Sequence, residues 1–420
     1  MRTVSQRKLR PILLRAGVAL LALTTKASTQ TVRDSAGINV VENVRPVLSA
    51  ARAWRVDPAP SIRLGANAAD ADTLNELLLV MGVTRLSDDR FAVGVQASNT
   101  VRFYDARGRF VGSAGRRGQG PGEFRQVMGV RRIRGDTLVV TDGGEVEIFT
   151  GDGKFVRQGP SRSRGDRFVY PVVVLEDGSY LGVMYDDSRS APPPAGRARR
   201  REPVVRVSRD GAVVDTIGSL TSGEALFDGR NVWGEAVAFS TGSVLSGDRA
   251  SFYIGSPSDA EITQFELGGK TTRVIRLPNR GGKPGDQEIR DYRAWRLAML
   301  GEDGRPMQPA MKQRIEQQLE RTVYADRLPA FGNLIVDRSG NLWAQRFDYR
   351  SAFFTPGPVR TQTIPVPTRW DVLDSSGVWL CTVDLPERFT PVEIGTDYVA
   401  GVARDQDEIE QVHVYRLRKP

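Results

Sequence analysis

The sequence contains a single cysteine, Cys381, and a single histidine, His413, among its 420 residues. One cysteine can form no intrachain disulfide, and it cannot build a cysteine-based zinc site or an iron–sulfur cluster. One histidine excludes zinc sites that use several histidines and disfavours a Ser-His-Asp triad in its usual form. Cys381 lies in an apolar run and His413 in an alternating stretch, so we expect both to be structural strand residues.

The sequence also lacks a concentrated basic patch. Its formal net charge is +9, which could attract nucleic acid, anionic lipid or an acidic polysaccharide. Most of the positive charge is arginine, a skew that is typical of a GC-rich genome, and it is spread along the chain without interleaved aromatic residues. A nucleic-acid partner is therefore not expected.

Long apolar runs are missing except near the start of the chain. Five basic residues within positions 2–15 precede the short apolar core 16–23, and small residues follow it. This pattern predicts a secretory signal at residues 1–27, cleaved after Ala27, and a lead-in at residues 28–53. The core is shorter than the roughly 20 residues that span a bilayer, so we expect no stable membrane insertion after cleavage. An uncleaved anchor remains the alternative, because Lys26 lies beside the cleavage site.

Glycine and proline are plentiful, at 43 and 24 residues, which suits many short strands joined by tight turns. A repeated pattern begins at Val80 and again at Val127, 47 positions later, within the range that indicates solenoids or propellers. Each unit holds four short apolar stretches separated by Asp, Gly or Asn, which tolerate hairpin turns. In the first unit these are 80–86, 91–95, 101–105 and 108–112, and in the second 127–130, 138–140, 146–149 and 153–156.

Looser units follow to the end of the chain. They start near Val169, Phe239, Leu334 and Thr390, and the last offers only three good strands. The segments 54–56 and 61–64 can supply its missing strand, which would hide the open sheet edges. The sequence therefore predicts an all-β fold: a six-bladed β-propeller of four-stranded antiparallel blades over residues 54–420.

One stretch carries a family resemblance. Phe103-Tyr104-Asp105, Gly108-Arg109-Phe110-Val111 and the ending Gly115-Arg116-Arg117-Gly118-Gln119-Gly120-Pro121-Gly122-Glu123-Phe124 resemble an NHL repeat. The likeness is full over residues 80–158 and echoes at 337–343. The whole chain is similar to exported bacterial six-bladed propellers, most of which have no assigned function. The resemblance implies that the glycines, Pro121 and Glu123 shape the crossing between blades. The histidine-dependent lyases among propellers are disfavoured by the single histidine.

Two segments interrupt the repeats. Residues 188–203 contain the run Pro192-Pro193-Pro194 followed by Arg197, Arg199, Arg200 and Arg201, and they predict a mobile loop, either solvated or in contact with an anionic partner. Residues 285–328 predict a helical insertion, with Asp286 as an N-cap and Pro309 opening a second helix. In that helix Met311, Ile315, Leu319 and Val323 recur on one face. The insertion is expected to pack on the propeller, with a lid or a docking surface as the alternative.

No catalytic residue can be assigned from the sequence, and binding and metal residues remain undetermined. Asp142, Asp186 and Asp187 follow second strands and could contribute to a calcium site of the lactonase kind, but a turn-capping role is favoured. Trp233 and Phe239 could line a pocket, though core packing explains them more simply. We expect an exported monomer, periplasmic or extracellular, that binds a protein or glycan without a cofactor. The alternative is a calcium-dependent hydrolase that uses carboxylates of the central channel.

Overall fold

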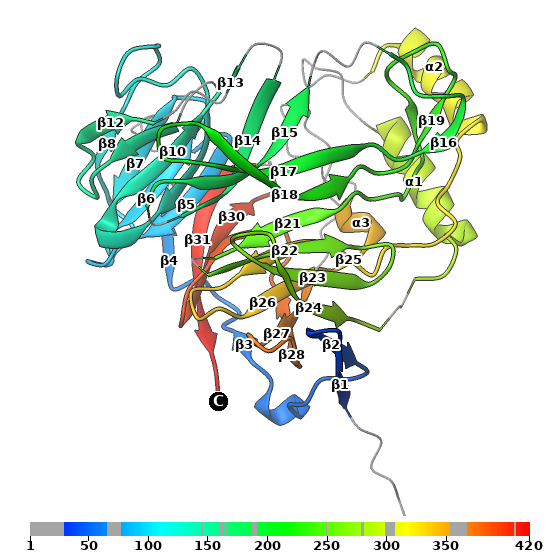
Figure 1. The fold of residues 1–420 in the computed structure, drawn as a ribbon. Coiled ribbons are helices and arrows are strands. Elements are labelled where there is room, and N and C mark those ends of the chain that lie inside the picture. Colours follow the sequence, from blue (N-terminus) through cyan, green and yellow to red (C-terminus); the bar gives the residue numbers. More distant parts are fainter. Residues whose placement is uncertain are drawn as a thin grey trace, which may run out of the picture.

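The fold is built mainly from short antiparallel strands (Figure 1). The structure is a computed structural model, and it describes residues 29–64, 77–143, 146–159, 163–164, 167–175, 177–186, 191–248, 250–278, 281–298, 307–352, 368–406 and 409–420. The predicted signal at 1–27 and residue Asp187 lie outside this range. The described helices are α1 (Asp286–Ala298), α2 (Pro309–Glu320), α3 (Tyr349–Ala352) and the 3-10 turns η1 (Ala50–Arg52) and η3 (Arg134–Asp136).

Six sheets of four or more strands follow one another along the described chain, and we number them I to VI. Each contains a four-stranded antiparallel meander, as the repeats predict. Sheet I is β5 (Val80–Arg85), β6 (Phe91–Val95), β7 (Thr100–Tyr104) and β8 (Phe110–Ala114); sheet II is β9 (Val127–Arg132), β10 (Leu138–Asp142), β11 (Val146–Phe149) and β12 (Phe155–Gln158). Sheet III is β13 (Ser163–Arg164), β14 (Arg167–Val174), β15 (Tyr180–Asp186), β17 (Arg201–Val207) and β18 (Val213–Thr221); sheet IV is β21 (Val244–Gly247), β22 (Ser251–Ser256), β23 (Glu261–Glu266) and β24 (Thr271–Arg276), extended by β2 (Ile38–Asn43) and β1 (Gln30–Ser35). Sheet V is β25 (Phe331–Val336), β26 (Leu342–Arg346), β27 (Thr368–Leu373) and β28 (Trp379–Leu385), and sheet VI is β29 (Phe389–Ile394), β30 (Tyr398–Arg404) and β31 (Glu410–Arg418) with β3 (Arg55–Val56) and β4 (Ile62–Leu64).

The sheets pack face to face in cyclic order. Alternation along each strand gives a sheet two apolar faces, and each face meets the next sheet in a separate core cluster. Burial of each large apolar side chain contributes about 1.5–3 kcal/mol. The clusters join Phe103 to Leu138 (I and II), Val139 to Tyr180 (II and III), Leu181 to Phe252 (III and IV), Ile262 to Leu342 (IV and V), Trp370 to Phe389 (V and VI) and Val414 to Phe91 (VI and I). This arrangement is a β-propeller, and the predicted fold class is confirmed.

The first strands of the sheets form the inner ring of the propeller. Strand β5 contacts β9 and β29, and β21 contacts β14 and β25, while β25 also contacts β29. Residues near the ends of these strands can therefore meet around the common axis, although their sheets are not neighbours.

Sheet VI is completed by the beginning of the chain. The last strand β31 pairs antiparallel with β3 through Leu417 and Val56 and with β4 through Val414 and Ile62. The Ser61 hydroxyl also donates to the Val414 carbonyl at 2.9 Å. The predicted closure of the last sheet by residues 54–56 and 61–64 is confirmed. It removes an edge that could otherwise pair with another chain.

The segment 115–124 forms the crossing from β8 to β9. Glu123 accepts hydrogen bonds from the backbone N–H groups of Gln119 and Gly120 at 3.1 and 3.0 Å and pairs with Arg116 at 2.7 Å. Phe124 is fully buried between sheets I and II. Gly115 has a φ of +77°, and a β-carbon there would lie 2.1 Å from the Phe124 ring. The carboxylate and the glycine thus shape the turn, as the motif implied.

A smaller sheet lies beside the helices (Figure 1). It consists of β16 (Gly196–Ala198), β19 (Ala225–Phe227) and β20 (Glu235–Ala236). Residues 196–198 and 201–203, which we predicted within a loop at 188–203, are in strands β16 and β17 instead. Their arginines are held by hydrogen bonds: Arg197 pairs with Glu224 and with Asp326 at 3.1 Å, and Arg199 donates to the Thr241 carbonyl at 2.8 Å.

The helical insertion contains α1 and α2, with one detail that differs from the prediction. Asp286 is the first residue of α1 rather than its N-cap. Gly285 precedes the helix, and its N–H donates to the Glu288 carboxylate at 3.1 Å, which is one half of a capping box. In α2, Ile315 and Leu319 are buried and Val323, just after the helix, is partly buried, but Met311 is exposed. The aromatic residues of this region gather around Phe239, which anchors the insertion.

Candidate functional site at the propeller axis

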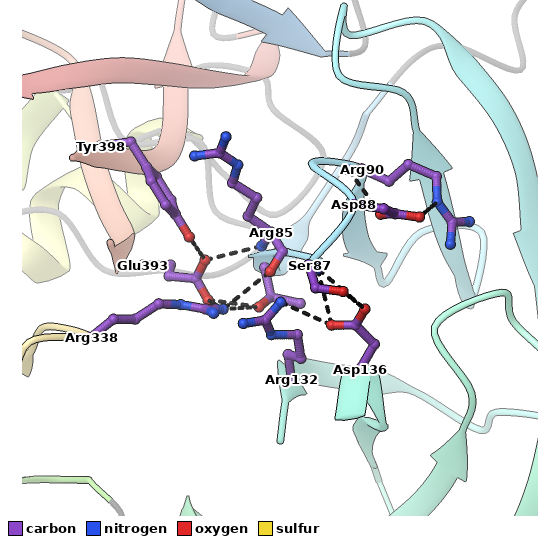
Figure 2. A network of polar contacts seen from close by, with 10 residues as sticks. Arg85, Ser87, Asp88, Arg90, Arg132, Asp136, Arg338, Glu393 and Tyr398 are labelled. Carbon is purple, nitrogen blue, oxygen red and sulfur yellow. Dashed lines mark hydrogen bonds and ion pairs between the residues drawn. The ribbon is translucent and has the colours of Figure 1, made fainter. Parts of the chain in front are cut away.

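Charged side chains lie near the ends of four first strands, at the axis of the ring. Figure 2 shows four of them, Arg85, Arg338, Glu393 and Tyr398, directed toward one another. We call Arg85, Arg131, Arg338, Glu393 and Tyr398 the axial cluster. Arg85 ends β5, Arg131 lies next to the end of β9, Arg338 follows β25, and Glu393 and Tyr398 flank the turn between β29 and β30. They come from sheets I, II, V and VI, so the cluster exists only when the ring is closed.

Glu393 is the centre of the cluster and is saturated with donors. Its Oε2 accepts hydrogen bonds from the Thr84 hydroxyl at 2.6 Å and from Arg338 Nη2 at 2.7 Å. Its Oε1 accepts from the Arg85 backbone N–H at 3.0 Å and from the Tyr398 hydroxyl. Four donors from three sheets therefore hold one carboxylate, which satisfies the buried charge.

The Glu393 carboxylate raises the pKa of both Arg338 and Tyr398, which keeps the arginine charged and the tyrosine neutral. Burial opposes the charge on Arg338, yet the nearby Glu393 raises the pKa of its guanidinium above the usual value. Burial first, and then the negative charge of Glu393, raise the pKa of the Tyr398 phenol, so it remains protonated and donates its hydrogen bond. The Arg85 guanidinium lies 5.0 Å above the Tyr398 ring and is paired with Asp89 at 2.6 Å.

Arg131 differs from the other members. Among the described residues it makes no hydrogen bond and no ion pair, and its side chain is exposed to solvent. Burial among surrounding protein atoms nevertheless lowers the pKa of its guanidinium, while Glu393 and Tyr170 act in the opposite direction. Glu393 belongs to sheet VI and Arg131 to sheet II, which are not neighbours, so their interaction runs across the axis.

A second polar group borders the cluster and is fully committed to the fold (Figure 2). The Asp136 carboxylate accepts from the Ser87 N–H at 3.0 Å and pairs with Arg132 at 2.8 Å, which links sheets I and II. Asp88 and Arg90 pair with one another at 2.6 Å within a single turn. These contacts fix the turns that surround the axis.

The arrangement suits anion binding better than proton transfer. A general base needs a lone pair that can reach a substrate, and the lone pairs of Glu393 are occupied by Thr84, Arg85, Arg338 and Tyr398. Arg131 offers a solvent-exposed guanidinium that has no ionic partner among the described residues, and an anionic group of a ligand can bind there.

Of the acidic residues considered at the sequence level, Asp142 is the one whose side chain the structure describes, and it caps a turn. Asp142 is buried and accepts from the N–H groups of Arg125 and Gln126 at 3.0 and 2.7 Å, the turn-capping role we favoured. Asp186 ends β15, and Asp187 lies outside the described residues. Within the described part of the chain, no three His, Cys, Asp or Glu side chains are grouped closely enough to hold a metal ion.

The remaining candidates have structural surroundings. Phe239 is buried among Tyr292, Tyr324 and Tyr349, as core packing predicts. Trp233 is 85% exposed beneath the Arg200 guanidinium, so the core role expected for it is wrong, and the two residues do not share a pocket. His413 lies in β31 and contacts Gln411 and Tyr415. Cys381 is buried in β28.

Sequence reasoning missed the axial cluster. Its members are far apart in the sequence: Arg85 and Glu393, for example, are in contact although 308 positions separate them. The only local signal is a charged residue near the end of a first strand, seen at Arg85, Arg131 and Glu393. That signal is weak because exposed strand ends are often charged.

Comparisons with known proteins agree with the fold. No known protein family matches the sequence, and no curated protein matches it. A member of the DUF4221 family from Bacteroides vulgatus is structurally similar at a TM-score of 0.50 and 9% identity, covering 88% of this chain and 99% of that one. A gluconolactonase from Xanthomonas campestris has a TM-score of 0.42 and 14% identity, covering 89% and 99%. At 9% identity the likeness to the DUF4221 protein supports the fold alone, and no conclusion is drawn from the likeness to the gluconolactonase. No helix in the described ranges has both the length and the apolar character needed to cross a membrane.

Proposed function

We propose that this protein is an exported six-bladed propeller of NHL-like repeats that binds a partner with acidic groups at its axis. Export rests on the signal pattern of residues 1–27, and the repeat assignment rests on the motif at 115–124. The six sheets and their cyclic core clusters support six blades.

Arg131 is the observation that carries the binding proposal. Arg131 is exposed to solvent, and no described residue forms an ion pair or a hydrogen bond with it, so its guanidinium is available to an anionic group of a ligand. Arg338, although engaged with Glu393, adds a second positive charge to the same region. The partner is a protein or glycan that presents carboxylate or sulfate groups, and Arg131 is its first contact.

Titration calorimetry with polygalacturonate, and with neutral dextran as the uncharged comparison, tests the proposal. We expect the acidic glycan to bind and Arg131→Gln to weaken binding about tenfold, which corresponds to the loss of one charge-assisted hydrogen bond. Arg369→Gln is the matched control, because Arg369 is 61% exposed, pairs with Asp384 and lies in β27, away from the axis. Equal weakening in both variants would show that only the net charge matters.

The second candidate is a calcium-dependent hydrolase of the lactonase type. Such sites need several unoccupied oxygen ligands, and here Glu393 and Asp136 are already engaged by protein donors. We therefore prefer the binding function to the hydrolase function. Calcium-dependent turnover of lactones that chelation abolishes would reverse this order.

A further inference from the structure

A pocket of about 550 Å³ lies between sheets II and III, and none of the residues that line it belongs to the axial cluster. Its wall on sheet II is Arg157 of β12, and its wall on sheet III is formed by the turns that follow β14 and β17. The volume lies within the range of small-molecule sites. The lining residues are Arg157, Asp177, Ser179, Arg206, Ser208, Arg209, Asp210 and Val214.

Three arginines line this pocket, and none of them has a carboxylate partner. Within the described ranges, Arg157, Arg206 and Arg209 form no ion pair at 4.0 Å or less. Arg157 makes a single weak hydrogen bond to the Gln158 carbonyl, at 3.5 Å. The Nε atom of Arg206 is buried and has no hydrogen-bond partner. Such unpaired donors are costly in a folded protein and mark a place where a ligand can supply the acceptors.

The acidic residues of the pocket are held by the turns on which they lie. Asp177 accepts hydrogen bonds from the N–H and hydroxyl of Ser179 at 2.9 and 2.5 Å. These bonds, opposed by burial and assisted by the charge of Arg206, lower the pKa of Asp177. Asp210 accepts a hydrogen bond from the Ser208 hydroxyl. Asp177 is therefore held in its ionised form near Arg206, and the Asp210 carboxylate is held by the turn on which it lies.

We propose that this pocket binds a small molecule through a single sulfate or phosphate group. Guanidinium groups bind tetrahedral oxyanions through paired N–H donors, and three of them surround the space here. Two fixed carboxylates on the wall repel additional negative charge, which favours one anionic group over a polyanion. The stems of the arginines and Val214 contact the uncharged part of the ligand. This site is separate from the axial cluster and does not depend on the function proposed for it.

Calorimetry with glucose 6-sulfate and glucose 6-phosphate tests the proposal, with glucose as the neutral comparison. We expect one or both esters to bind and glucose not to bind. Binding of both indicates recognition of a tetrahedral oxyanion in general, and binding of one identifies the group.

The variants Arg206→Gln and Arg209→Gln should each weaken ester binding about tenfold. Arg209 is exposed and unpaired among the described residues, so its variant should fold even if Arg206→Gln does not. Arg369→Gln and Arg131→Gln are the controls and should bind normally. Failure of the wild-type protein to bind either ester at 10 mM, or unchanged binding by Arg209→Gln, would overturn the proposal. Loss with Arg131→Gln alone would place the ester at the axis instead.

Discussion

Arg338 Nη2 lies 2.7 Å from Glu393 Oε2, and this ion pair joins sheet V to sheet VI. The same arginine donates to the Thr84 hydroxyl at 3.1 Å, which adds sheet I to the contact. Glu393→Gln keeps the shape of the side chain but removes its charge, so we expect the free energy of unfolding to fall by about 1–3 kcal/mol. Urea denaturation measures the change.

The control for that substitution is Glu266→Gln. Glu266 is 57% exposed and has only a 4.0 Å contact with Lys270, so its loss should change stability by less than about 0.5 kcal/mol. If both variants were equally stable, Glu393 would not hold the ring together.

Gly115 lies in the connection between sheets I and II, and we expect its substitution to destabilise the protein strongly. Gly115→Ala places a β-carbon against the Phe124 ring in a residue whose φ is +77°, and we expect a loss of about 2–4 kcal/mol. Gly37→Ala is matched in backbone, with a φ of +79°, but has nothing within 4 Å of the added carbon. It should cost only about 1 kcal/mol. Thermal unfolding compares the two, and equal losses would contradict a role for the ring contact.

His413 makes stability depend on pH below neutrality. Burial first, and then the nearby Arg63, lower its pKa from 6.5 to about 4. Between pH 6.5 and about pH 4, the unfolded chain therefore binds a proton at this imidazole that the folded chain does not bind. The histidine contributes fully to stability above pH 6.5, and this contribution falls towards pH 4 by about 1–3 kcal/mol.

The only histidine gives a single imidazole signal in a proton NMR titration, so the pKa can be read directly. His413→Gln should show a smaller loss of stability between pH 6.5 and 4 than the wild-type protein. A titration midpoint near 6.5 would contradict the predicted shift.

Cys381 should be unreactive in the folded protein. Its side chain is buried, and burial raises the pKa of the thiol, which leaves little thiolate at neutral pH. We expect a thiol reagent to label less than about a tenth of the native protein in an hour at pH 8, and all of it in guanidinium chloride. Rapid labelling of the native protein would show that β28 opens readily.

The sequence predicted the scaffold well because its signals are local. Strand alternation and turn residues recur in every repeat, and the apolar segments at 54–56 and 61–64 matched the gap in the last unit. The capping aspartates could also be predicted, since Asp142 contacts neighbours fewer than 20 positions away.

The axial cluster and the arginine-lined pocket could not be predicted from the sequence, because both depend on how separate sheets pack against one another. Arg131 and Glu393 interact across the axis, and Arg157 and Arg206 share a pocket only because sheets II and III pack at a particular angle. The loop prediction at 188–203 failed for a related reason. Arg197 and Arg199 are held by Glu224 and the Thr241 carbonyl, which belong to segments distant in the sequence.

The pairing of β4 with β31 has a consequence for the order of folding. Ser61 and Val414 are hydrogen-bonded although 353 positions separate them, so β4 must wait during synthesis until β31 has been made. Closing so long a loop is slow, and sheet VI cannot form before β31 is available. Sheets I to V can assemble beforehand, but the faces of sheets I and V that pack against sheet VI remain uncovered until then. Loss of β31 would therefore leave the whole circle open.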